Sequence, residues 1–304
     1  MSGAAIRLGV TQSAVSQSIR QLEEELGVVL INRTRRPMTL TPFGFALKNR
    51  GRLLSEEIAN LKAQVIQAGQ GIKPDLRIGL VDSFASTCGS SFTKMLLAKA
   101  SQLSIRTGLS PQQGEALMRR DLDLIVTSDP LMDADDVVRY RLFTERYLVI
   151  TPPRMLIPVT TMEDVRLLVN TLPIVRFNRK SQVGAQIERF LRRIDVRTPN
   201  RLELDNADAL TSMVSAGIGW AITTPMCLLQ ASPQAVKVST HIVKSLDLER
   251  SLYLVARRNE YSEFFTEACD VAREVLQNTF LPGLAALQCD VGQLITLNER
   301  NASE

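Results

Sequence analysis

The first regular pattern along the chain is a run of apolar residues spaced three or four positions apart from Thr11 onward. They are Val15, Ile19, Leu22 and Leu26. An α-helix turns by about 100° per residue, so these side chains share one face, which we expect to be buried. Thr11 is a suitable N-cap, and Gly9 suits the tight turn that follows a short helix over residues 3–9.

The opposite side of this predicted helix is polar. Gln can read adenine, Arg can read guanine, and Ser can approach bases or phosphates without steric bulk, as a DNA recognition helix requires. An ordinary solvated helix face is the alternative, but the preceding turn and the basic segment downstream favour recognition. We expect DNA contacts from Thr11, Gln12, Ser13, Ser16, Gln17 and Arg20.

The basic segment that follows is typical of a β-hairpin. Two short strands, Val28–Asn32 and Met38–Thr41, flank a tip that contains Arg33, Arg35 and Arg36. Arginines on such a tip would contact phosphates or the minor groove, which positions a protein on DNA without reading much sequence. A solvated hairpin with no DNA contact is the other interpretation.

A long helix is predicted after Thr41-Pro42, since this pair provides an N-cap and a proline in the first turn. Its apolar residues follow a heptad pattern as far as Gly69. They are Leu47, Leu54, Ile58, Leu61, Val65 and Ala68. So narrow an apolar stripe favours a homodimer formed through residues 42–71, and dimers of this kind could associate further into a homotetramer.

The remaining three quarters of the chain alternate short apolar strands with helices. The first set of strands is expected at 76–81, 103–109, 122–128 and 146–152, and a second unit follows with strands at 173–177, 201–205 and 220–224. A strand at 250–257 and a helix at 262–281 would return to the first unit. Strands that are apolar on both faces predict a mainly parallel sheet, which binds ligands at the carboxyl ends of its strands.

The segment AAIRLGVTQSAVSQSIRQLEEELGVVLINRTRRPMTLTPFG resembles the N-terminal region of LysR-type transcriptional regulators, and LTSMVSAGIGWAITTP resembles their effector domains. The resemblance implies an α/β protein with a winged helix-turn-helix, a long linker helix and a two-lobed effector domain like the type 2 periplasmic binding proteins. The expected domains are 1–41 for DNA binding, 42–71 for the linker, 75–152 for lobe I, 153–232 for lobe II, and 233–304 for the return to lobe I and the C-terminal tail.

One departure from the family pattern concerns the N-terminal end. Family members carry a further helix of about twenty residues ahead of the segment that begins here at Gly3, and that helix covers the apolar face of Val15, Ile19 and Leu22. We expect the first helix of the winged helix-turn-helix to be missing here, through a misassigned start or a truncation of a working gene. Loss of DNA binding is the less favoured explanation.

Hydroxyl and amide side chains follow several predicted strands. Together with N–H groups at helix N-termini they could bind a small carboxylate or aromatic acid between the lobes. The alternative is that each side chain only caps its own helix or turn. The expected effector contacts are Ser83, Phe84, Ser86, Thr87, Thr127, Ser128, Asn178, Ser181 and Thr223. Arg176 and Arg179 could add a positive charge, although simple surface exposure is as good an explanation.

Charge supports this division of roles. Residues 1–74 hold 10 Lys and Arg against 5 Asp and Glu, a net of +5, and the remainder holds 26 against 27, a net of −1. Only the first quarter of the chain therefore suits a polyanion such as double-stranded DNA. No apolar run is long enough to span a bilayer and no secretion signal is evident, so we expect no membrane partner and a cytoplasmic protein.

Other classes of protein fit less well. Four scattered cysteines and a single histidine, His241, argue against a zinc site or a His-dependent triad, so we expect no metal, no cofactor and no enzymatic activity. Nucleophile-elbow, P-loop and zincin motifs are absent, and a transport-type binding protein would not need a recognition helix. Two alternatives stay open: a ligand-binding protein that no longer binds DNA, and a thiol redox sensor that uses Cys88.

Overall fold

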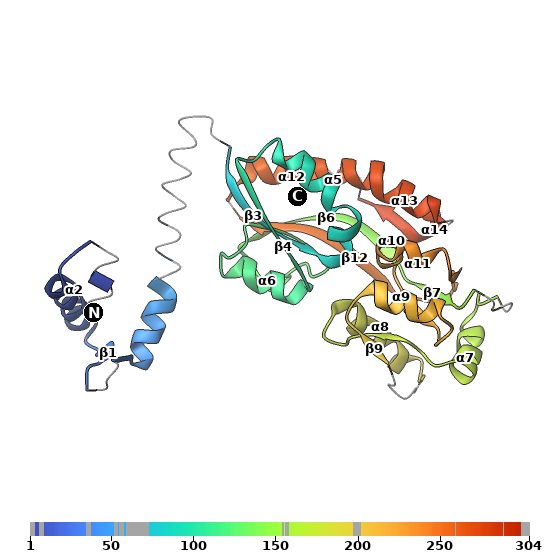
Figure 1. Cartoon of the computed structure of the whole chain (residues 1–304), viewed down its shortest axis with the longest axis horizontal. Helices are drawn as coiled ribbons and strands as arrows, with labels where there is room; N and C mark the ends of the chain where they lie inside the picture. The colour runs from blue at the N-terminus through green and yellow to red at the C-terminus, as the bar shows by residue number, and fades with distance from the viewer. Residues whose placement is uncertain are drawn as a thin grey trace. The chain divides into compact units, whose positions relative to one another are not determined.

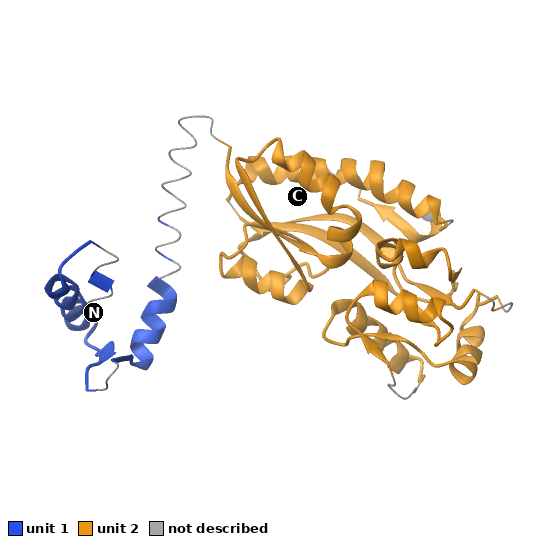
Figure 2. Ribbon diagram, in the orientation of Figure 1, with its two compact units in different colours: residues 1–72 blue, residues 73–304 orange. Residues whose placement is uncertain are grey.

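A computed structural model describes residues 4–5, 9–34, 38–51, 54, 58, 73–153, 155, 158–196, 202–258, 260–287 and 289–298. The chain divides into two compact units, Met1–Ile72 and Lys73–Glu304 (Figure 2). Each unit is described separately below.

Unit 1 contains the predicted helix and hairpin. Helix α2 spans Gln12–Leu26, and its N-cap Thr11 accepts a hydrogen bond from Ala14 N at 3.2 Å. Strands β1 (Ile31–Asn32) and β2 (Thr39–Leu40) pair antiparallel, which confirms the hairpin with shorter strands than predicted. A further helix begins at Pro42, capped by a hydrogen bond from Gly44 N to Thr41 Oγ1 at 3.1 Å.

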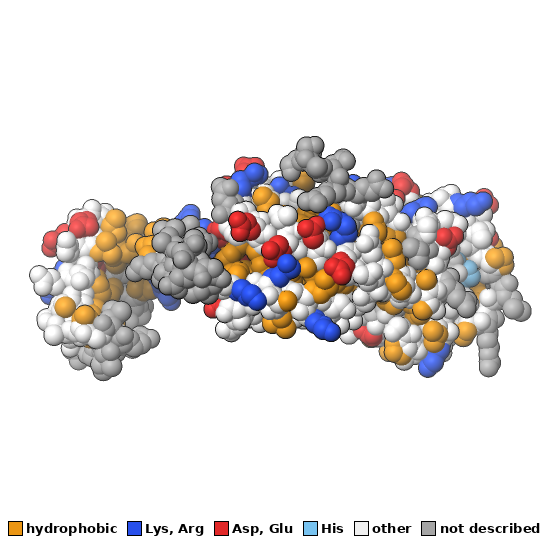
Figure 3. Space-filling view, turned by 90° about the horizontal axis from the view of Figure 1, so that it is seen from above, with side chains coloured by type: hydrophobic (Ala, Val, Ile, Leu, Met, Phe, Trp, Pro, Cys, Tyr) orange, Lys and Arg blue, Asp and Glu red, His pale blue; other side chains and the backbone are white. Residues whose placement is uncertain are grey.

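The apolar face of α2 is not buried. No residue of α2 is fully buried, and Leu22 and Leu26 are 36% and 49% exposed. Val15 and Ile19 are half-buried, so the prediction of a fully buried face is wrong for the described part of the chain. Apolar atoms are visible on the surface of unit 1 (Figure 3), where Leu54 and Ile58 of the predicted heptad stripe are also more than half exposed. Leu61, Val65 and Ala68 lie outside the described residues, and the dimer stays a prediction.

The main sheet of unit 2 has six strands in the order β13-β6-β12-β5-β3-β4 (Figure 1). The strands are β3 Asp75–Val81, β4 Gln102–Gly108, β5 Leu124–Thr127, β6 Val137–Arg146, β12 Glu249–Arg257 and β13 Ile295–Leu297. Only β3 pairs parallel, with β4 and β5, whereas the pairings among β5, β12, β6 and β13 are antiparallel. The expectation of a mainly parallel sheet is wrong, because β6, which the pattern did not predict, and the returning strand β12 reverse the direction.

Helices cover both faces of this sheet (Figure 1). They are α4 Asp82–Thr87, α5 Gly89–Leu97, α6 Ser110–Met118, α12 Ser262–Val275, α13 Leu281–Ala286 and α14 Val291–Leu294. Helices α5 and α12 pack on one face and α6 on the other. The long helix predicted at 262–281 is interrupted by a π-helical turn, Leu276–Phe280.

A second region of unit 2 is built around the strand β7, Leu148–Thr151. Strands β10 (Ala221–Thr223) and β11 (Ser239–His241) flank β7 antiparallel in a separate three-stranded sheet. The remaining elements are α7 Met162–Thr171, β8 Arg176–Phe177, α8 Gln182–Arg193, β9 Glu203–Leu204, α9 Ala207–Ser215, α10 Pro225–Gln230 and α11 Ser232–Ala235. Strands β8 and β9 pair parallel.

The chain passes between the two sheets of unit 2 twice. It leaves the six-stranded sheet between β6 and β7, at Tyr147, and returns between His241 and Glu249. The strand predicted at 146–152 therefore exists, but it belongs to the second sheet. The lobe limits 75–152, 153–232 and 233–304 stay predictions. The first crossing lies near the limit at 152, whereas β11 still pairs with β7 beyond the limit at 232.

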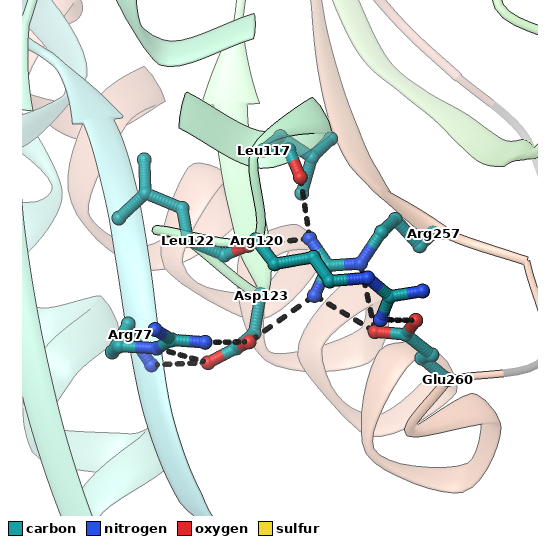
Figure 4. Close-up of polar contacts among 7 residues, drawn as sticks. All are labelled: Arg77, Leu117, Arg120, Leu122, Asp123, Arg257 and Glu260. Atoms are coloured by element: carbon teal, nitrogen blue, oxygen red, sulfur yellow. Dashed lines mark hydrogen bonds and ion pairs between the residues drawn. The ribbon is translucent and has the colours of Figure 1, made fainter. Parts of the chain in front are cut away.

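A buried polar cluster joins the strands β3, β5 and β12 (Figure 4). The Asp123 carboxylate pairs with Arg77 Nη2 at 2.9 Å and with Arg257 Nη2 at 3.2 Å. Glu260 in turn pairs with Arg257 Nη2 at 2.7 Å and with Arg120 Nη1 at 2.5 Å. Because Asp123 and Arg257 are less than a tenth exposed, removal of either side chain would leave the other charge buried without compensation, which is strongly destabilising.

Candidate functional site

The polar side of α2 is open to solvent in unit 1. Thr11, Gln12, Ser13, Gln17 and Arg20 are exposed, and Ser16 is half-buried. The Thr11 hydroxyl is engaged as the helix cap and also lies 2.9 Å from Ser13 Oγ. These side chains form one hydrophilic helix face of the size that a major groove admits.

Glu23 connects α2 to the hairpin. Its Oε1 accepts hydrogen bonds from Leu30 N at 2.8 Å and Ile31 N at 3.2 Å, and its Oε2 pairs with Arg33 Nη2 at 2.7 Å. The Leu30 N–H group is the main cause of a lowered pKa at Glu23, and burial opposes it. Arg33 is therefore held by an ion pair, whereas Arg35 and Arg36 lie outside the described residues.

Unit 2 contains a cavity of about 70 Å³. It has room for a few water molecules or a small ligand. Predicted effector residues in its wall are Ser83, Ser128 and Ser181. Other polar residues in the wall are Asp82, Ser110, Gln182, Asp205, Asn206, Cys227, Gln230 and Arg250. Loops and helix ends from both sheet regions of unit 2 thus line one partly open pocket.

Six predicted effector residues are not part of this wall. Three are fully buried or engaged elsewhere: Phe84 packs edge-on against Phe92, Thr127 Oγ1 accepts from Asp129 N, and the Thr223 side chain is enclosed. Ser86 is exposed, Thr87 Oγ1 donates to Ser83 O at 2.7 Å, and Asn178 Nδ2 donates to Asp205 Oδ1 at 2.7 Å. Phe84, Thr87, Thr127 and Asn178 thus have a packing or local hydrogen-bonding role, whereas Ser86 is exposed and the Thr223 hydroxyl is buried without a partner in the described chain.

A chain of hydrogen bonds crosses one side of the cavity. Ser110 Oγ lies 2.9 Å from Ser128 Oγ, and Ser128 Oγ donates to Gln182 Oε1 at 3.1 Å. Ser110 begins α6, Ser128 follows β5, and Gln182 begins α8. A bond between Ser128 and Gln182 joins the two sheet regions directly across the cavity.

The N-termini of α6, α8 and α9 reach the cavity wall, as does that of the short helix α4. Ser110 begins α6, the cap Ser181 precedes α8, and the cap Asn206 precedes α9. N–H groups in a first helical turn have no intrahelical acceptor and carry partial positive charge. Ser181 Oγ satisfies Gly184 N and Asn206 Oδ1 satisfies Ala209 N, so the earlier N–H groups of each turn are the ones available to a ligand. This arrangement favours an anion.

Arg250, at the start of β12, is one of the polar wall residues that the sequence reasoning missed, and it is the only Lys or Arg among the described residues of the wall. It is 4% exposed, and its Nε donates to Glu145 Oε1 at 2.7 Å. Burial lowers the pKa of Arg250, but Glu145, Cys227 and Tyr147 together outweigh it, and the net shift of the pKa is upward. The signal was present in the strand alternation, because Arg250 occupies the same side as the buried Leu252 and Leu254.

The other candidate groups occupy defined places. Arg176 and Arg179, the proposed extra charges, both pair with Glu188, at 2.6 Å and 3.9 Å, and neither is part of the wall. All four cysteines are buried and reduced, and burial raises the pKa of Cys88 to about 11. In the described part of the chain, no group of three or more His, Cys, Asp or Glu side chains is placed to hold a metal ion.

The sequence profile of the LysR substrate binding domain matches residues 69–277. The chain belongs to the LysR family of transcription regulators. The profile of the bacterial regulatory helix-turn-helix protein, lysR family, matches residues 1–45 as well. The family consists of transcription regulators with an effector-binding domain rather than enzymes, and this confirms the resemblance drawn from the α2 region.

Individual relatives agree over most of their length. The HTH-type transcriptional regulator CzcR of Bacillus subtilis is 25% identical over 264 residues, which cover 86% of this chain and 87% of CzcR. An OxyR C206 mutant of Corynebacterium glutamicum has a TM-score of 0.60 at 18% identity and covers 94% of this chain and 90% of that one. Full-length BenM has a TM-score of 0.57 at 19% identity, with 91% of each chain covered. These structural likenesses confirm the two-lobed LysR fold.

For this LysR-type regulator, no helix among the described residues is both long enough and apolar enough to pass through a bilayer.

Proposed function

We propose that this regulator binds double-stranded operator DNA through α2 and the hairpin, and that a small carboxylate bound in the cavity of unit 2 controls it. The observation that carries the effector half is the cavity wall itself, where four serines meet the N-termini of α6, α8 and α9. The exposed polar side of α2 carries the DNA half. Both roles place the protein with the chromosome, in the cytoplasm.

The proposed DNA-binding residues are of two kinds, those that contact bases and those that contact phosphates. Arg20 and its polar neighbours on α2 would contact base edges, and Arg33, Arg35 and Arg36 would contact phosphates. Arg20→Ala should therefore reduce the affinity for a preferred site by roughly tenfold or more. The ratio of this affinity to the affinity for shuffled DNA should fall as well. Arg35→Ala should weaken binding to every sequence and flatten its salt dependence.

The test uses DNA fragments that the full-length protein selects from a random-sequence pool, with affinities measured by fluorescence anisotropy. Arg119→Ala, which removes an exposed charge from unit 2, is the control and should leave DNA binding unchanged. An equal loss on all sequences for the Arg20 and Arg35 variants would contradict the division of roles. Failure to select any sequence would favour the alternative of a ligand-binding protein that no longer binds DNA.

The effector half is tested by thermal shift and calorimetry against a panel of small carboxylates and aromatic acids. Ser128→Ala and Ser181→Ala should each weaken the affinity of a binding acid, because each loses a hydroxyl of the wall. Ser86→Ala is the matched control, since Ser86 is exposed and outside the wall. Equal effects of all three substitutions would place the ligand elsewhere.

Control of DNA binding requires communication between the cavity and the oligomer. We infer a homodimer through residues 42–71 and a homotetramer of two such dimers, in which lobe closure changes the spacing of the DNA-binding units and the bend of the DNA. A ligand can shift this equilibrium only through a difference in its affinity for the two arrangements. Footprints and DNA bending with and without a binding acid measure the shift, and identical footprints at saturation would refute it.

A further inference from the structure

The cavity of unit 2 has charged groups of both signs in its wall. Arg250 provides the positive charge, and Asp82 and Asp205 provide two negative charges. A wall built only for a simple carboxylate has no use for carboxylates of its own, because like charges at short range disfavour binding. Asp82 is the first residue of α4, a position that favours a carboxylate, and Asp205 is exposed, yet both residues line the same pocket as Arg250.

Arg250 is placed to hold the anionic end of a ligand. Its Nε donates to Glu145, and its Nη2 contacts Glu145 and donates to Thr224 Oγ1 at 3.2 Å. Among the described residues no oxygen acceptor is within hydrogen-bond distance of the remaining nitrogen, Nη1. The side chain is 4% exposed, belongs to the cavity wall and also interacts with the Cys227 thiol. A thiol is a weak acceptor, so a ligand carboxylate can replace it as a partner of the guanidinium.

The two aspartates are placed to hold a cationic end. Within the described chain Asp82 has neither a hydrogen bond nor an ion pair through its carboxylate, and it is only partly exposed. Asp205 accepts a single side-chain hydrogen bond, from Asn178 Nδ2 through Oδ1. Neither carboxylate is paired with a Lys or Arg of the described chain, so both keep acceptor capacity for an ammonium group.

We propose that the effector is amphoteric: a small molecule that carries a carboxylate and an ammonium group, as an α-amino acid does, with the carboxylate on Arg250 and the helix N-termini and the ammonium on Asp82 and Asp205. This proposal rests on the proposed function, since it concerns the ligand of the same cavity. It adds that a carboxylate without a cationic group is a poor effector, because the aspartates would repel it and remain unpaired.

The experiment uses thermal shift and calorimetry on the full-length protein to compare ligands that share a side chain but differ in their ammonium and carboxylate groups. The probes are the twenty common L-amino acids, the 2-hydroxy acids with the same side chains, which lack the ammonium, and the primary amides, which lack the carboxylate. At least one amino acid should bind, about tenfold or more tightly than its 2-hydroxy acid and its amide.

Two variants locate the ammonium site. Asp205→Asn and Asp82→Asn remove a charge but keep the size of the side chain, and each should reduce the preference for the amino acid over the 2-hydroxy acid. Asp133→Asn is the control, because Asp133 is exposed, has the same charge and is outside the wall. A preference that survives both cavity variants would overturn the assignment of the aspartates.

The outcomes separate this proposal from the proposed function. If 2-hydroxy acids or other plain carboxylates bind as tightly as amino acids, or if only they bind, the amphoteric ligand is wrong while effector control through the cavity stands. If no carboxylate of any kind binds, the proposed function of the cavity fails too.

Discussion

Replacement of Asp123 by asparagine tests how much the buried polar cluster of Figure 4 contributes to the stability of unit 2. The Asp123 carboxylate accepts four hydrogen bonds: from Arg77 N, Nε and Nη2 at 2.9, 3.1 and 2.9 Å, and from Arg257 Nη2 at 3.2 Å. Asparagine keeps the shape of the side chain but removes its charge. It also replaces one acceptor oxygen by an NH₂ group that faces donors.

The size of the effect follows from burial. Removal of one partner from a buried ion pair costs about 3–5 kcal/mol, because the other charge stays buried without compensation. Arg257 would keep Glu260 and the carbonyl oxygens of Leu117 and Leu122, both 2.6 Å from Nη1. We therefore expect the lower end of this range, about 3 kcal/mol.

Urea unfolding followed by the fluorescence of Trp220 measures this loss. Trp220 is the only tryptophan of the chain and is fully buried in unit 2, so its signal reports that unit alone. With a slope of about 3 kcal/mol/M, a loss of about 3 kcal/mol lowers the unfolding midpoint by about 1 M. Glu115→Gln is the control, because Glu115 and its partner Arg119 are 66% and 65% exposed and such pairs contribute under about 1 kcal/mol.

Two results would refute this reasoning. One is an Asp123→Asn midpoint that matches the Glu115→Gln midpoint. The other concerns the double variant Asp123→Asn/Arg257→Met. If the unpaired Arg257 guanidinium causes the loss of unfolding free energy, the double variant should lose less than the sum of the two single variants, since residues in direct contact do not act independently. Losses that simply add would contradict this cause.

Three further predictions concern other parts of unit 2. Burial lowers the pKa of His241 in the folded protein. The stability that neutral His241 contributes is therefore present above its unfolded pKa of about 6.5, and it is lost as the pH falls through the lower folded pKa. His241→Gln should flatten the pH dependence of the melting temperature below about pH 7. An unchanged slope would be evidence against this role for the only histidine of the chain. Gly184→Ala should destabilise the protein by about 2 kcal/mol or more, because the added Cβ would lie 2.2 Å from the Asn178 carbonyl oxygen. Gly114→Ala should cost less than about 1 kcal/mol, because the added Cβ would contact only the flexible end of the Leu131 side chain. Equal melting temperatures for the two glycine variants would show that the α8 backbone yields more easily than its packing indicates. Cys88→Ser should leave DNA binding in the presence of peroxide unchanged, because a thiol with a pKa of about 11 forms little of the reactive thiolate at neutral pH. A peroxide response that disappears in this variant would establish the redox alternative.

The elements that the sequence predicted well are those whose causes are local. Thr11 caps α2, Gly27 ends it with a φ of +66°, and Thr41 caps the next helix, all through contacts within a few residues. Strand β6 was missed for an equally local reason. Its charged residues, such as Arg139 and Arg141, break the apolar run by which buried strands were recognised, because most of its central residues are only partly buried.

Long-range contacts decided the rest. The pattern at 146–152 predicted a strand correctly, but nothing in it distinguishes membership of the first sheet from membership of the second, since that depends on pairing with β10 and β11 far along the chain. Likewise every predicted effector residue lies at a strand or helix end, and only the folded chain separates Ser128 and Ser181 in the wall from Thr127 and Thr223 in the core.

By itself the sequence determined the family, the helix α2 with the hairpin that follows it, and the α/β class of the larger unit, because periodicity, capping and turn chemistry act between near neighbours. The tertiary structure alone decided how the sheets are assembled and which polar groups meet in the cavity. Arg250 illustrates the difference: its partner Glu145 is distant in sequence, and the two become neighbours only where β12 pairs with β6. Side-chain proximity of this kind is a property of the assembled sheet, and no local pattern encodes it.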